Sequence, residues 1–386
     1  MSNFWWEQTD YKPNEQVNTE VRNHVIYDED GDNVLLDKLI TDIHHLDSCI
    51  INNDNLLTIN DCGKKHFTLN LYQYNDNKII CNDIHECTVN GGYISSSKSQ
   101  NHDNKLISLG IVKTDNIEII DYNNNKDLLI NLSSNQNGLF GVSEFIDNNS
   151  NNLFLELRIL KQHLGKPSLS VLRLWHLGFK ETNNNNNNNG EEEEDDDDEI
   201  EKIVWQIENI KGIVHFCSNF YKEEIILAHE DRKINNIEFI NKNNGMITRS
   251  ISTNEWSGRV LYSKNGDSFA VTSFGKICIY DSITGNIMNT INSPITNDVY
   301  PIVPISFLDN DIIITRINYD RTLILTNLKT NVSIICKNIG GTINDKSLIV
   351  DDNEKYLWSY PYGAIEIYDL QQLLNQLHNK NNETNK

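Results

Sequence analysis

Residues 258–292 read GRVLYSKNGDSFAVTSFGKICIYDSITGNIMNTIN, and this stretch decides the fold. Four runs rich in β-branched and aromatic residues alternate with turn signals at Asn265-Gly266, Gly275 and Thr284-Gly285. Short runs of β-formers separated by such turns are typical of consecutive antiparallel strands. The stretch therefore predicts one small sheet of four strands.

The third run of this unit recurs along the whole chain as apolar, any residue, apolar, apolar, polar. The seven copies occupy residues 69–73, 117–121, 172–176, 237–241, 277–281, 323–327 and 365–369. The longest interval contains the low-complexity residues 181–200, and without them the period is about 40 to 50 residues. That period is typical of propeller blades with four strands, and it is too long for one coil of a β-solenoid.

Residues 275–291, GKICIYDSITGNIMNTI, resemble a WD40 repeat, in which a Trp-Asp pair closes the third strand and a Thr-Gly turn follows. Trp175, Tyr280 and Tyr368 stand in the Trp column. The resemblance covers residues 42–377 at the level of period and strand pattern. It implies an all-β fold, a seven-bladed β-propeller with four antiparallel strands in each blade.

The resemblance also implies structural roles for several aspartates. Asp121, Asp281 and Asp369 fill the Asp column of the repeat. Four more precede the third strands, where the family places a structural Asp in a tight turn: Asp61, Asp115, Asp231 and Asp320. A His ahead of the first strand bonds this Asp in such repeats, which would pair His44 or His45 with Asp61, and His85 with Asp115. Solvent exposure is the alternative for these histidines.

The expected domain organisation is an N-terminal extension (1–33), a propeller (34–377) and a disordered tail (378–386). The last blade lacks a good fourth strand, because residues 370–377 read as a short helix. Two spare β-runs, 24–28 and 34–40, precede the first blade. We expect one of them, above all 34–40, to pair with the third strand of the last blade and close the ring.

Composition limits the function classes. The 386 residues carry 33 basic and 55 acidic side chains, a net charge of −22, which argues against direct nucleic-acid binding and against docking on an anionic membrane. Only three Ala occur, so a helical bundle is not expected. No apolar run is long enough for a membrane span, and the N-terminal residues do not read as a secretory signal. Seven scattered Cys without CxxC indicate reduced thiols in the cytoplasm or nucleus.

The segment 183–198 consists of seven Asn, one Gly, four Glu and four Asp, between the third and fourth strands of the third blade. Such a segment buries no surface, so disorder is expected across the insert 181–200. One interpretation is an acidic tether for a basic protein. The other is drift of a repetitive tract in a permissive surface loop.

Two Cys-x3-His pairs, Cys62/His66 and Cys81/His85, are weak metal candidates. A structural zinc site needs four convergent ligands, whereas isolated Cys residues usually pack as small apolar groups, so no metal is expected. The aromatic pair Trp5-Trp6 has two interpretations, an anchor for a partner groove or packing against the barrel side. The paired carboxylates at Asp351-Asp352 are expected to be solvated turn residues.

No nucleotide-binding, metalloprotease, serine-hydrolase or EF-hand motif occurs in the chain. We therefore expect a non-catalytic, WD40-like scaffold for protein–protein interactions, or a subunit of a larger intracellular complex, without a cofactor. Its expected partners are other proteins, which the sequence does not identify, and basic proteins are one option. The alternatives are a hydrolase-like propeller enzyme with a site in the channel, and a binder of basic proteins through the acidic loop.

Overall fold

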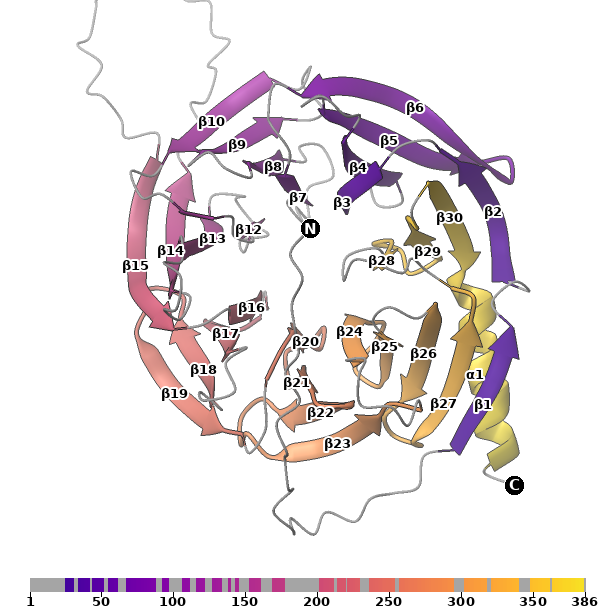
Figure 1. Cartoon of the computed structure of the whole chain (residues 1–386). Helices are drawn as coiled ribbons and strands as arrows, with labels where there is room; N and C mark the ends of the chain where they lie inside the picture. The colour runs from indigo at the N-terminus through magenta and orange to yellow at the C-terminus, as the bar shows by residue number, and fades with distance from the viewer. Residues whose placement is uncertain are drawn as a thin grey trace, which may run out of the picture.

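The structure, a computed structural model, describes residues 25–30, 34–41, 44–51, 55–61, 67–87, 92–96, 106–111, 116–121, 127–133, 138–139, 143–145, 153–160, 169–177, 201–211, 214–219, 221–229, 236–253, 257–294, 302–317, 321–339, 348–361 and 363–384. The described strands form seven sheets, which we call blades one to seven in chain order. The blades stand around a central axis as a ring (Figure 1). The expected all-β propeller fold is confirmed.

Blades one to three come from the first half of the chain. Blade one contains β3 (His44–Ile51), β4 (Asn55–Asp61), β5 (Phe67–Asn75) and β6 (Lys78–Cys87). Blade two contains β7 (Gly92–Ser96), β8 (Leu106–Ile111), β9 (Asn116–Asp121) and β10 (Asp127–Ser133). Blade three contains β11 (Gly138–Leu139), β12 (Ser143–Phe145), β13 (Leu153–Leu160), β14 (Leu169–Leu177) and β15 (Glu201–Lys211).

Blades four and five repeat the plain antiparallel meander. Blade four contains β16 (Val214–Ser218), β17 (Glu224–His229), β18 (Asn236–Asn241) and β19 (Ile247–Ser252). Blade five contains β20 (Val260–Tyr262), β21 (Ser268–Ser273), β22 (Lys276–Asp281) and β23 (Ile287–Asn292). Since consecutive strands alternate in direction, the turn between the first two strands and the turn between the last two lie at the same end of each blade.

Blades six and seven combine strands from both ends of the chain. Blade six contains β24 (Ile302–Phe307), β25 (Ile312–Ile317), β26 (Thr322–Asn327) and β27 (Val332–Lys337), with β1 (Val25–Asp30) outside them. Blade seven contains β28 (Leu348–Val350), β29 (Tyr356–Ser359) and β30 (Ala364–Asp369), with β2 (Leu35–Ile40) outside them.

All seven copies of the sequence repeat lie in the third strand of a blade, namely β5, β9, β14, β18, β22, β26 and β30. Each of these strands lies between two other strands. Those whose burial is fully described are largely buried, and β26 is an example. A strand that is buried on both faces needs a nearly continuous run of apolar residues, and this requirement produces the repeat in the sequence. The repeat therefore predicted the blades correctly.

The predicted pairing of residues 34–40 with the last blade is present. Strand β2 pairs antiparallel with β30, and Leu39 lies opposite Ile365 (Figure 1). A register shift between Leu35 and Asp37 marks a bulge at Leu36, so simple alternation of side chains does not hold along β2. Leu35 packs on the apolar cluster shared with blade six, whereas Leu36 packs on the cluster shared with blade one.

The other spare β-run has a place that the sequence did not predict. Strand β1 pairs in parallel with β27, with Val25 opposite Val332 and Asp30 opposite Lys337, as a fifth strand of blade six. Both spare runs are therefore outer strands of neighbouring blades. The apolar pattern of a short run does not distinguish a parallel from an antiparallel partner, so this assignment needed the structure.

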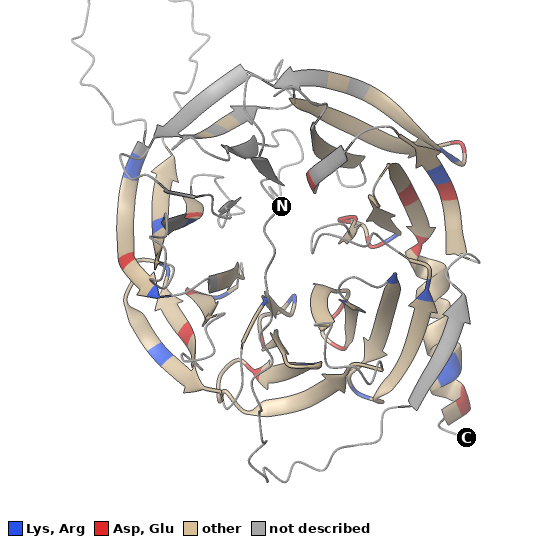
Figure 2. Ribbon diagram, in the orientation of Figure 1, with Lys and Arg blue, Asp and Glu red and all other residues tan. Residues whose placement is uncertain are grey.

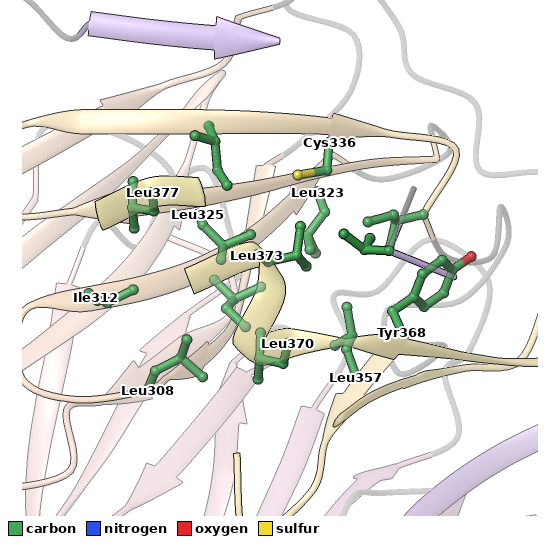
Figure 3. Packing of buried hydrophobic residues seen from close by; sticks show 14 of the residues in the cluster. Leu308, Ile312, Leu323, Leu325, Cys336, Leu357, Tyr368, Leu370, Leu373 and Leu377 are labelled. Atoms are coloured by element: carbon green, nitrogen blue, oxygen red, sulfur yellow. The ribbon is translucent and has the colours of Figure 1, made fainter. Parts of the chain in front are cut away.

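The C-terminal helix α1 (Leu370–Thr384) fills the gap outside blades six and seven. Leu370, Leu373 and Leu377 enter the same apolar cluster as Leu325 of β26 and Leu357 of β29 (Figure 3). The expected helix at 370–377 is thus present, but it continues through residues expected to be a disordered tail. Asn381 is buried there and its side chain meets the Thr330 hydroxyl at 2.7 Å, so tertiary contact holds a polar segment in the helix.

One buried carboxylate connects strands from the two ends of the chain. Glu366 of β30 is 1% exposed. Its carboxylate accepts hydrogen bonds from Lys38 of β2 at 2.6 Å, from Arg321 beside blade six at 3.0 Å and from the Tyr368 hydroxyl at 2.6 Å. One side chain therefore joins β2, blade six and blade seven.

Candidate functional site

A groove lies between blades four and five and is lined mainly by polar and charged residues. Its volume is about 310 Å³. Its lining, which we call the interblade groove, consists of Lys222, Glu224, Arg249, Tyr262, Ser282 and Ile283. All six belong to the blade end at which first-to-second and third-to-fourth strand turns lie, or to the strands that lead to that end.

The wall from blade five is the turn after β22. Oδ1 of Asp281 accepts hydrogen bonds from the backbone N–H of Ile283 at 3.0 Å and of Thr284 at 2.6 Å, and from the Thr284 hydroxyl at 2.8 Å. Gly285 has a φ of 71°, and a Cβ there would lie 2.6 Å from Cδ1 of Ile251 in blade four. The sequence DSITG therefore fixes the turn and holds Ile283 at its tip.

The wall from blade four is an ion pair that also holds the two blades together. Nη2 of Arg249 lies 3.1 Å from Oε2 of Glu224, and Nη1 donates to the Ile283 carbonyl across the groove at 2.8 Å. The guanidinium also stacks on the Phe239 ring, 3.7 Å from its centroid. Arg249 thus connects the two blades, and its positive charge is largely compensated by these groups of the protein itself.

Two buried residues that line the groove carry hydroxyl groups. Ser282 is 3% exposed, and its Oγ has no hydrogen-bond partner although the residue lines the cavity. Tyr262 is buried as well, and burial raises the pKa of its phenol above the usual value, so the hydroxyl stays protonated at neutral pH. An unpartnered buried hydroxyl is costly unless something else supplies a hydrogen bond.

Large apolar side chains are exposed at this end of blades four and five, and one of them, Ile283, lines the groove. Ile283 at the blade-five turn is 76% exposed, Tyr221 next to Lys222 is 69% exposed, and Met246 in the outer turn of blade four is 66% exposed. These residues lie in turns at one end of the two blades, where polar residues normally stand. Exposed apolar groups at one end of a fold favour that end as an interaction surface.

The charged groups around the groove are mixed, with a small excess of acid. They are Lys222, Glu223, Glu224, Lys242, Arg249, Asp267 and Asp281. Lys242 is buried, and its Nζ donates to the Asn219 carbonyl at 2.6 Å. Hydrogen bonds from Thr284 lower the pKa of Asp281, which keeps this carboxylate ionised. Figure 2 shows both signs of charge on blades around the described part of the ring.

The candidate metal ligands are not brought together in the described part of the chain. Cys62 and His66 lie outside the described residues. Cys81 is half-buried in β6 against the apolar cluster between blades seven and one, and His85 lies in the same strand opposite Leu69. Among described residues, no group of three or more His, Cys, Asp or Glu is arranged to hold a metal ion. The five cysteines whose side chains are described form no disulfide, namely Cys49, Cys81, Cys217, Cys278 and Cys336.

The aspartates singled out from the sequence lie in different settings. Asp281 holds the turn described above, and Asp369 caps α1 by accepting the N–H of Gln372 at 2.9 Å. Asp61 ends β4 directly opposite His44 of β3. Asp115, Asp231 and Asp320 lie outside the described residues, as do Trp5, Trp6 and the insert 181–200.

Residues of the Trp column donate hydrogen bonds to buried carboxylates. Nε1 of Trp175 lies 2.9 Å from Oε2 of Glu156 on the adjacent strand of blade three, and the Tyr368 hydroxyl donates a hydrogen bond to Glu366.

Asp351 is not the solvated turn residue that was expected, because it is buried and accepts hydrogen bonds from the N–H groups of Lys355 and Tyr356 at 2.8 and 2.6 Å. The expectation failed because the carboxylate organises its own turn instead of facing water.

A second polar centre lies inside the ring. Burial raises the pKa of the Tyr360 hydroxyl well above its usual value; the nearby Asp47 carboxylate adds to this, and Arg316 opposes it. All three residues are at most 4% exposed. Groups so completely buried contribute to packing between blades one, six and seven and offer little surface to a ligand.

Sequence reasoning did not find the groove because its residues come from two repeats. Ile283 gave the one usable signal, an Ile at the tip of a tight turn in DSITG. Arg249 and Lys222 belong to no motif, and only folding places them around one cavity with the DSITG turn. Among the described helices, none is long and apolar enough to cross a membrane.

Comparisons with known proteins were made for the whole chain. No protein-family profile matches it, and no curated protein matches its sequence. Among solved structures, a chain of the mitotic checkpoint complex is similar at a TM-score of 0.59 and 9% identity, covering 95% of this chain and 98% of that one. The Cps50 (Swd1) β-propeller domain from Myceliophteria thermophila is similar at a TM-score of 0.55 and 8% identity, covering 86% of this chain and 99% of that one.

The chain has a WD40-like β-propeller fold. Because 1144 solved chains are similar in structure, the fold is common and says little about the task of any one member. Function has to be argued from the surface of this chain.

Proposed function

We propose that this chain is a non-catalytic propeller that serves as a scaffold for protein–protein interactions, as a subunit of a larger complex in the cytoplasm or nucleus. The observation that carries the proposal is a set of large apolar side chains that are exposed in turns at one end of blades four and five, Tyr221, Met246 and Ile283. Exposed groups of this size favour association with another protein.

The rigidity of the groove supports the same role. Arg249 connects blade four to the turn of blade five, and Asp281 fixes that turn with three hydrogen bonds. A surface held in this way loses little conformational freedom on binding, which favours affinity. The fold also occurs in a multi-protein assembly, the mitotic checkpoint complex, which is consistent with a subunit role.

The test is affinity purification of the tagged full chain from cells that express it, followed by mass spectrometry and measurement of the mass of the native assembly. We expect at least one partner in stoichiometric amount. A chain that stays monomeric, with no reproducible partner, would contradict the scaffold role. A second arm without residues 182–199 separates partners held by the acidic insert, whose binding would also weaken with salt.

A further inference from the structure

The size and the lining residues of the interblade groove indicate the chemistry of its ligand. We propose that it holds a short basic segment of a partner protein, with one apolar side chain packed beside Ile283 and an adjacent Lys or Arg near Asp281. This inference rests on the proposed scaffold role and adds a place and a ligand chemistry to it.

The size of the groove favours a peptide segment. A volume of about 310 Å³ is at the lower end of the range of ligand sites and suits one or two side chains. Ile283, which lines the groove, offers an inserted apolar side chain contact area that is now exposed to water. Burial of that area by a partner side chain is favourable, because apolar surface is removed from water.

The hydroxyl of Ser282 supplies a polar contact point. Its Oγ is buried without a partner inside the residues that line the cavity. The two carbonyls of this turn are already used, since Arg249 donates to both Ser282 O and Ile283 O. An extended peptide brings backbone N–H and C=O groups, and either one satisfies a hydroxyl. The groove thus presents an apolar contact and an unfilled hydrogen bond next to each other.

Charge selects a basic segment over an acidic one. The guanidinium of Arg249 is bound to Glu224 and to the turn carbonyls, and the ammonium of Lys242 is buried. Lys222 lies 3.8 Å from Asp267. Glu223 is exposed and Asp281 is half-buried, and neither carboxylate forms an ion pair among the described residues, in a chain whose net charge is −22. Long-range attraction of a basic partner and repulsion of an acidic one follow.

The experiment selects a random peptide library against the purified full chain and measures the enriched peptides by fluorescence anisotropy. We expect them to combine an aliphatic or aromatic residue with an adjacent Lys or Arg, and to bind less tightly as NaCl is raised. Ile283→Asp should weaken binding at least tenfold. Ser282→Ala should weaken it about fivefold, the equivalent of one hydrogen bond.

Controls separate the groove from the rest of the surface. Ile84→Asp replaces an isoleucine that is 62% exposed on blade one and should leave peptide binding unchanged. Asp281→Asn keeps an oxygen acceptor for the turn and should weaken basic peptides selectively while reducing the salt dependence. Melting temperatures confirm that each variant is folded.

Two outcomes overturn the inference: enrichment of acidic peptides or of none, and peptide binding that Ile283→Asp leaves unchanged. If affinity purification still finds stoichiometric partners in those cases, the scaffold role stands and only the assignment of the groove is wrong. If peptides bind as expected but no partner is found, the scaffold role fails and the groove is a peptide site without an assembly.

Discussion

Glu366 is the residue at which three parts of the ring meet. Its buried carboxylate is shared by Lys38, Arg321 and Tyr368. Lys38 and Arg321 have partly exposed side chains, so water moderates their loss of a counter-charge. The carboxylate itself is enclosed, which makes its replacement more costly than loss of a surface ion pair.

Glu366→Gln should therefore destabilise the protein by about 2 to 4 kcal/mol, because two cations would then face each other without the carboxylate between them. Urea unfolding at neutral pH measures the change. Glu208→Gln, in an exposed position of β15, is the matched control and should have little effect. A loss below about 0.5 kcal/mol for Glu366→Gln would show that the cluster contributes no more than a surface pair.

Asp351 gives the protein a pH-dependent stability. Burial raises the pKa of its carboxyl above the ordinary 3.8, so the folded state favours the protonated form. The stabilisation is complete below the unfolded value and is lost as pH rises through the folded value. Asp351→Asn keeps an acceptor for the N–H groups of Lys355 and Tyr356 and cannot ionise.

Relative to the parent, the melting temperature of Asp351→Asn should therefore rise as the pH increases from about 3.5 to about 7. Circular dichroism melts of both proteins at several pH values measure the difference. A difference that is constant with pH, or that changes in the opposite direction, would mean that the carboxylate is not disfavoured by its burial.

Individual residues show where sequence reasoning stops. The role of Asp281 in a tight turn could be predicted from DSITG, because its hydrogen bonds are local. The burial of Asp351, the helix cap at Asp369 and the interblade contacts of Arg249 depend on contacts that a motif does not contain. Local chemistry is written in consecutive residues, whereas burial depends on what packs from elsewhere.

At the scale of elements, the two N-terminal strands differ in what they hold together. Strand β2 replaces the missing fourth strand of blade seven and pairs over most of its length with β30. Strand β1 adds a fifth strand to a blade that already has four. We therefore expect loss of β2 to open the ring and loss of β1 to trim an edge.

Three truncations test this difference. Removal of residues 1–22 takes away no described strand and should be mild, and removal of 1–31 removes β1 with a moderate loss of stability. Removal of 1–41 should abolish cooperative unfolding or solubility, because blade seven would keep three strands. Calorimetry and gel filtration measure both properties. Cooperative melting of the 1–41 truncation near the intact temperature would contradict closure by β2.

A point substitution separates pairing from packing in the same strand. Leu36 is half-buried at the bulge, against the cluster of blades seven and one. Leu36→Asp should cost about 1 to 3 kcal/mol, because a charge would replace apolar contact while part of it stays in water. Ile40→Asp, at a position 69% exposed in β2, is the control and should be close to neutral in urea unfolding.

The strands were predictable to different degrees. The third strand of every blade is enclosed by its neighbours and so carries a dense apolar signal, whereas outer strands such as β19 alternate exposed and half-buried residues. No sequence pattern indicated that β1 pairs in parallel with β27. The second half of α1 is polar, yet it packs on the protein through Asn381. Tertiary contacts decided those elements against their local composition.

At the scale of the whole molecule, the acidic insert is an addition to the repeating pattern of four strands. It connects β14 to β15, and the pairing of these strands places Leu177 directly opposite Glu201. Strand ends so close together need only a short turn. The length of the insert is therefore not required by the ring.

Deletion of residues 182–199 should leave the melting temperature within about a degree of the parent, because the remaining residues still span the gap and no expected burial is removed. Differential scanning calorimetry measures the change. A fall of several degrees would show that the segment packs on the ring. Scrambling the same residues while keeping the length provides the control for composition.

The pairing of β2 with β30 also has a consequence for synthesis of the chain. Lys38 and Glu366 are 328 positions apart, so β2 leaves the ribosome long before its partner exists. At about 5 to 20 residues per second, the delay is roughly 15 to 65 seconds. Throughout that time one edge of a β-forming segment has no mate, a state that invites pairing with other nascent chains. Translation of β30 ends the delay, so a ribosome that stalls before this strand would leave an almost complete ring with β2 still unpaired.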